Sequence, residues 1–175
     1  MTHLFAAALV VQLLNPSGAP AAIVRQAQEE VVRVYADIDV PIEWSAESPA
    51  ETDRPAAIRL VLLPYETGDL RRSERQVMGA AMRTPEGNAI AYVFYRRVQA
   101  EADRYQVSIG SVLACAIAHE LGHLLMPDTA HAASGLMRAG WSRDDFNRFQ
   151  IGDPVMIEIH NGMAGIPWVY GVYRP

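Results

Sequence analysis

Apolar and polar residues follow one another in a pattern that predicts a helix and several strands in the first part of the chain. Residues 21–35 carry apolar side chains at helical spacing, which predicts an amphipathic helix. Apolar runs at 40–44, 58–63 and 89–95 predict strands, and the run at 58–63 is apolar enough for the centre of a sheet. The polar, proline-containing segment 45–55 is expected to be a loop.

Helical patterns dominate the later part of the chain. Residues 108–125 form a long apolar run that Ser108 would cap and that Pro127 would end. Ser142 has the spacing of a capping box with an acidic residue and opens a further helix to about residue 149. A helix, then strands, then two helices predict a small α+β domain. Its mixed sheet would carry an N-terminal helix, an active-site helix and a C-terminal helix.

The N-terminal segment 1–21 has the order of a secretory signal. The apolar run 4–14 is too short to span a bilayer and is followed by a helix breaker and small residues, although no Lys or Arg precedes it. We expect a signal peptide or N-terminal anchor here, and therefore a secreted or periplasmic bacterial protein. A buried N-terminal helix or strand is the alternative. Residues 22–150 would form the folded domain and residues 151–175 an aromatic tail.

Composition narrows the class of protein further. The 175 residues include 15 basic side chains, all Arg, and 20 acidic ones, so the net charge is −5. This balance argues against a general nucleic-acid binder, which needs a concentrated basic surface. We expect the small basic cluster Arg71, Arg72 and Arg75 to be a solvated loop or helix face and not a binding site. The single Cys115 excludes an internal disulfide framework.

The candidate chemistry lies in residues 119–123, His-Glu-Leu-Gly-His, an HExxH motif of which roughly 0.01 are expected by chance from this composition. Residues four apart share a helix face, so the imidazoles of His119 and His123 can reach one zinc ion. Glu120 is rotated by about 100° from His119, which places its carboxylate beside the metal rather than on it. Zinc also offsets the cost of burying these groups in an apolar helix. Hydrogen-bonded core histidines are the alternative.

A catalytic zinc has three protein ligands and an open position, so a third ligand is needed. His131 follows the motif beyond the break at Pro127, and Asp128 could reach back from the turn. Three further candidates are Asp144, Asp145 and Cys115. Cys115 and His123 are separated by about 12 Å along a helix axis, so we expect Cys115 to be a packed core residue.

The HExxH motif, His131 and the following segment Ser134-Gly135-Leu136-Met137 together resemble the metzincin metallopeptidases. The resemblance implies that His119, His123 and His131 bind zinc and that Glu120 is the general base. It also implies that Met137 is the Met-turn residue beneath the metal.

The resemblance further implies that strand 89–95 is the edge strand along the substrate cleft and that a helix follows the Met-turn. The chain departs from the family pattern at Met126 and Thr129, where the family has a glycine and the third histidine. A longer loop after Pro127 would have to bring His131 to the metal.

These observations predict a secreted zinc-dependent endopeptidase that hydrolyses peptide bonds through a zinc-bound water activated by Glu120. Glu120 would pass the proton to the leaving amine, and the peptide substrate would pair with an exposed sheet edge. The main alternative is a non-catalytic, zinc-stabilised binding module of the cell envelope. A membrane-tethered interaction protein that keeps its N-terminal segment is a third hypothesis. We expect no nucleic-acid partner and no stable membrane span.

Overall fold

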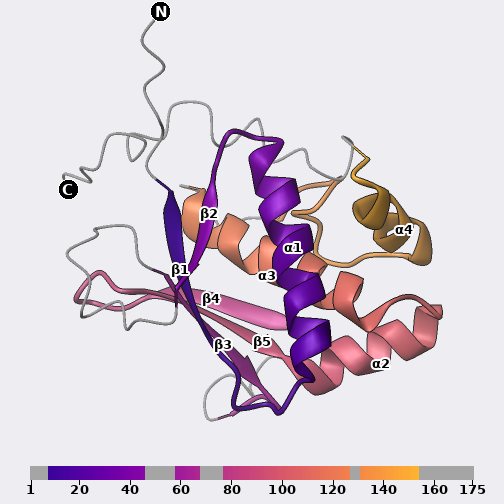
Figure 1. The fold of residues 1–175 in the computed structure, drawn as a ribbon, viewed down its shortest axis with the longest axis horizontal. Helices are drawn as coiled ribbons and strands as arrows, with labels where there is room; N and C mark the ends of the chain where they lie inside the picture. Colours follow the sequence, from indigo (N-terminus) through magenta and orange to yellow (C-terminus); the bar gives the residue numbers. More distant parts are fainter. Residues whose placement is uncertain (1–7, 46–57, 68–76, 127–130, 154–175) are drawn as a thin grey trace, which may run out of the picture.

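The computed structural model describes residues 8–45, 58–67, 77–126 and 131–153 (Figure 1). Within these residues, a five-stranded mixed sheet is combined with four helices, which confirms the predicted small α+β class. The elements are, in chain order, β1 (Leu9–Leu14), α1 (Ala21–Ala36), β2 (Ile42–Ser45), β3 (Ile58–Leu63), β4 (Gly79–Arg83), β5 (Ala89–Phe94), α2 (Tyr95–Tyr105), α3 (Ile109–Leu125) and α4 (Arg143–Ile151).

The strands are arranged in the order β2-β1-β3-β5-β4. The pairs β1–β2, β1–β3 and β3–β5 are parallel, and β4 pairs with β5 in the antiparallel direction. The prediction that residues 89–95 form the edge strand is therefore wrong, because β5 lies between β3 and β4; among the described strands the two edges are β2 and β4. The Gly-Ala-Ala sequence of β4 lacks the β-branched and aromatic residues that mark a strand, so its pattern was not recognised.

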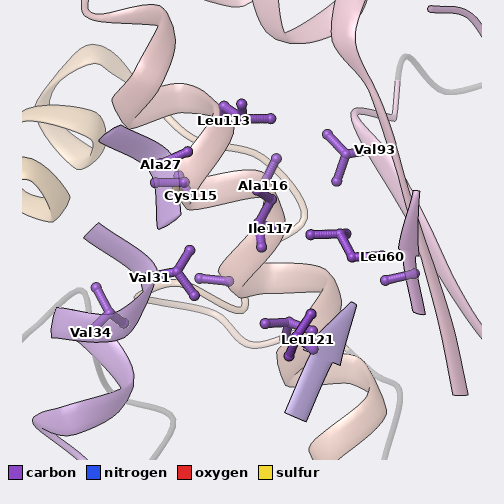
Figure 2. Packing of buried hydrophobic residues seen from close by; sticks show 14 of the residues in the cluster. Ala27, Val31, Val34, Leu60, Val93, Leu113, Cys115, Ala116, Ile117 and Leu121 are labelled. Carbon is purple, nitrogen blue, oxygen red and sulfur yellow. The ribbon is translucent and has the colours of Figure 1, made fainter. Parts of the chain in front are cut away.

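Helix α3 is the centre of the hydrophobic core. It contacts α1, α2, α4, β4 and β5, and Figure 1 shows α1 and α3 against the sheet with α2 and α4 on their outer side. Figure 2 shows Ile117 and Leu121 of α3 between Val31 of α1 and Leu60 of β3. Nearly every residue of α3 is buried, so polar side chains on this helix are held in a largely apolar environment.

The apolar run near the N-terminus supplies strand β1. Leu9–Leu14 pair with β2 on one side and with β3 on the other, and Val11 is fully buried. This is the buried-strand alternative to the signal interpretation. A parallel strand that is covered on both faces has a continuous run of apolar residues. A signal segment has the same kind of run, so the sequence could not distinguish the two. Cleavage near Ala22 would remove β1 from between its two partners.

Most other predicted elements are present with small shifts of their ends. The helix predicted at 21–35 is α1, the strand predicted at 40–44 is β2, and the strand at 58–63 is β3. The polar stretch 96–106, for which no element was predicted, forms α2, whose buried side chains are few. No helix in the described ranges has the length and apolar character that crossing a membrane requires. The basic cluster Arg71–Arg75 and the tail beyond residue 153 lie outside the described residues.

Candidate metal centre

Helix α3 places the whole HExxH motif in a rigid, buried turn. Ser108 caps the helix as predicted, its hydroxyl accepting the backbone N–H of Ser111. The helix ends at Leu125 because Met126, which precedes Pro127, adopts an extended backbone. The Arg83 guanidinium of β4 donates to the Leu124 carbonyl at 2.8 Å, which ties the edge strand to the end of α3.

The three histidines named from the sequence converge in space. Within the described residues, one ligand atom from each of His119, His123 and His131 lies within 4.8 Å of the others. The Nε2 atoms of His119 and His123 are 2.9 Å apart. Zinc–nitrogen bonds of about 2.0–2.1 Å in a tetrahedron separate two ligand nitrogens by about 3.3 Å, so the arrangement fits a zinc ion.

The orientation of His119 is set by the loop that follows α3. Its Nδ1 lies 2.8 Å from the Leu136 carbonyl oxygen, which can only accept a hydrogen bond. Nδ1 therefore carries the ring proton, and Nε2 presents its lone pair toward His123. This is the tautomer that a metal ligand needs, held by a backbone carbonyl as is usual for zinc-bound histidines.

Burial favours the neutral form of His119 and His123, which is the form that binds metals. Burial lowers the pKa of His119 to about 4, with further lowering by His123 and His131 and an opposing effect of the hydrogen bond to Leu136. Burial and the neighbouring His131 also lower the pKa of His123. Zinc binding requires deprotonated imidazoles, so neither of these two rings has to lose a proton near neutral pH.

Glu120 is buried against the edge strand and not among the histidines. It is 6% exposed and makes no hydrogen bond to any residue that the structure describes. A Cβ atom built on Gly79 of β4 would lie 2.5 Å from its Oε1 atom, so only glycine leaves room for the carboxylate. Burial raises the pKa of Glu120 to about 8. A neighbouring cation would favour the charged carboxylate, which a general base needs.

The described segment that begins at His131 forms a closed loop that packs against α3. The backbone N–H of Ala132 donates to the Met137 carbonyl at 2.8 Å, and Gly135 takes a positive φ of 70° inside this loop. Met137 is 2% exposed, and a Cβ atom built on Gly122 would lie 2.5 Å from its Sδ atom. The Met137 side chain therefore packs directly on the helical turn between His119 and His123.

Two contributors to the site were not identified from the sequence. Trp141 packs edge-on against His119, with ring centroids 5.1 Å apart and planes at 89°. Gly79 contacts Glu120 from β4, as described above. Trp141 lies four residues after Met137 in the chain. An aromatic residue so close to the proposed Met-turn is the sequence feature that could have pointed to a contact with the site. No sequence signal connects Gly79 with Glu120, because their contact depends on strand pairing.

The other candidate ligands have different environments. Cys115 is buried in the hydrophobic core, as predicted, and burial raises the pKa of its thiol. Asp145 belongs to the capping box of α4, which confirms the predicted cap at Ser142. Asp144 is exposed and does not join the histidine group. Asp128 lies outside the described residues.

Comparisons with known proteins find distant similarities among solved structures. No family model and no curated protein matches the chain. Among solved structures, the chain is similar to a zinc-dependent peptidase from Methanocorpusculum labreanum strain Z, with a TM-score of 0.49 and 19% identity over 79% of this chain and 92% of that one. It is also similar to the GM1-bound form of the ECX AB5 holotoxin, with a TM-score of 0.42 and 12% identity over 92% of this chain and 80% of that one.

Proposed function

We propose that this chain is a zinc-dependent endopeptidase whose ligands are His119, His123 and His131 and whose general base is Glu120. The observation that carries the proposal is the convergence of three histidine nitrogens within 4.8 Å, two of them from α3, together with the buried carboxylate of Glu120 on that helix. Zinc held there would supply Lewis-acid chemistry to polarise a peptide carbonyl. We assign Met137 the role of a Met-turn residue, because it is buried directly beneath the metal-binding turn.

Glu120 has a position suited to proton transfer. It lies one residue after a ligand, is buried, and has no described hydrogen-bond partner that would occupy its oxygens. It takes a proton from the attacking water and delivers it to the leaving amine nitrogen. A purely structural zinc site has no use for such a carboxylate, and burying it without a function would cost stability.

Strand β4 is the surface that we assign to the substrate. It is an edge strand, so a peptide in extended conformation could extend the sheet by pairing with it. Gly79, at the start of β4, is the residue that contacts Glu120. A peptide bound along β4 would therefore pass the general base. This assignment replaces β5, which has strands on both sides.

The decisive experiment replaces Glu120 with glutamine, which keeps the size of the side chain and removes its basicity. We expect Glu120→Gln to bind one zinc ion per chain and to cleave unstructured peptides about 10² to 10⁴ times more slowly than the unsubstituted protein. Glu29→Gln, an exposed position on α1, is the matched control and should keep full activity. Zinc-loaded protein without peptidase activity would favour the binding-module alternative, and full activity in Glu120→Gln would exclude the mechanism.

A further inference from the structure

His131 is held differently from the other two histidines. His119 and His123 lie on the buried helix α3, whereas His131 is exposed and belongs to a loop. Its ring stacks on His119 with centroids 5.3 Å apart, but it makes no hydrogen bond to a described residue. The position of His131 therefore depends on what holds its loop.

The loop of residues 131–138 is closed by its own backbone hydrogen bonds, and its last residue, Arg138, forms an ion pair. The Ala132 N–H donates to the Met137 carbonyl, and the Arg138 N–H donates to the Gly135 carbonyl at 3.3 Å. The Arg138 guanidinium then donates to an Oδ2 atom of Asp145 at 3.0 Å. Arg138 thus connects the far end of the His131 loop to the first turn of α4.

Asp145 is a rigid anchor for this contact. Its Oδ2 atom also accepts the backbone N–H and the hydroxyl of Ser142, both at 2.8 Å, as part of the capping box. The Asp145 side chain is only 13% exposed, compared with 41% for Arg138. Helix α4 is in turn fixed by Phe146 and Phe149, which are buried in the core. Charge-assisted hydrogen bonds to a restrained carboxylate are stronger than those of a free surface pair.

We propose that the Arg138–Asp145 ion pair positions His131 for zinc binding, so that both residues are positioning residues for the third ligand. The inference rests on the proposed function, because it requires that His131 binds zinc. It also explains why an acidic residue in the first turn of α4 is not a ligand: its oxygen is used to hold the loop that carries one. The expected effect is on metal affinity, since groups that orient zinc ligands typically change it by about 10- to 100-fold.

The test is a zinc titration of the full chain, stripped of metal and competed against a chromophoric chelator. We expect Arg138→Met and Asp145→Asn each to raise the zinc Kd about tenfold, with no further rise in the double variant. Asn at position 145 keeps an acceptor for the Ser142 cap, so the helix should remain intact. The matched control is Arg148→Met, which removes an ion pair between α4 and Asp153 and should leave the Kd unchanged.

A second background separates positioning of His131 from a general loss of stability. In His131→Ala, Arg138→Met should leave the already weakened zinc affinity unchanged, because the ligand through which it acts is absent. Wild-type affinity in Arg138→Met, or an equal loss in both backgrounds, would overturn the inference. Failure of the unsubstituted chain to bind zinc would instead overturn the proposed function.

Discussion

Met137 packs on Gly122, and this contact should reverse the stabilising effect that a glycine-to-alanine substitution in a helix normally has. Replacing a glycine inside a helix with alanine normally stabilises a protein by about 1 kcal/mol. Here the added Cβ would lie 2.5 Å from the Met137 Sδ atom and 3.1 Å from its Cε atom. Met137 is 2% exposed and has no solvent to move into, so overpacking of about 1–3 kcal/mol should oppose the helical gain. We expect Gly122→Ala to lower the free energy of unfolding by about 0–2 kcal/mol.

The same substitution should become stabilising when the methionine side chain is removed. In a Met137→Ala background the clash is absent, so Gly122→Ala should raise the free energy of unfolding by about 1 kcal/mol. The coupling between the two positions is then about 1–3 kcal/mol. Urea unfolding of the four proteins in a chelating buffer measures it without any contribution from bound metal. An equal stabilisation in both backgrounds would show that Met137 does not pack on this turn.

Two further predictions concern the N-terminal strand and the location of the metal. A chain that starts at Ala22 should fail to fold, because it lacks β1 between β2 and β3. Circular dichroism and urea unfolding measure this, and a cooperatively folded Ala22 chain would contradict the strand order of the sheet. In a Trp44→Phe/Trp168→Phe protein, Trp141 is the remaining tryptophan. Stoichiometric Co²⁺ should quench most of its fluorescence, because its ring centroid lies 5.1 Å from that of His119. Unchanged emission with bound cobalt would place the metal elsewhere.

Helices α1, α3 and α4 and the central strand β3 could be predicted from the sequence because their signals are local, whereas the polar segment that forms α2 carries few apolar positions and gave no such signal. Ser108 and Ser142 mark the starts of α3 and α4 by capping chemistry that involves only the next few residues. Strand β1 was ambiguous, since a strand buried on both faces and a signal segment share the same apolar run. Strand β4 was missed because its identity depends on pairing with β5 and not on its own residues.

The candidate site divides in the same way. His119, Glu120 and His123 are related by helical spacing, so the sequence alone could group them. His131 follows His123 by more residues than in the metzincin pattern, so the sequence alone could not show that its ring reaches the other two histidines. The structure brings His119, His123 and His131 together. The contacts of Gly79 with Glu120 and of Trp141 with His119 join separate elements, and no spacing rule predicts them. The use of Asp145 as an anchor likewise depends on where Arg138 lies in space.

The wide separation of paired segments has a consequence for folding during protein synthesis. The Tyr35 hydroxyl of α1 donates to the Ala118 carbonyl of α3, and these residues are 83 positions apart. At about 5–20 residues per second, a ribosome needs roughly 4–17 s to make the chain between them. During that time the apolar face of α1 and the strand before it have no helix α3 to cover them. Chaperone capacity and translation speed should therefore limit the yield of this protein more strongly than they would limit a helical bundle of local contacts.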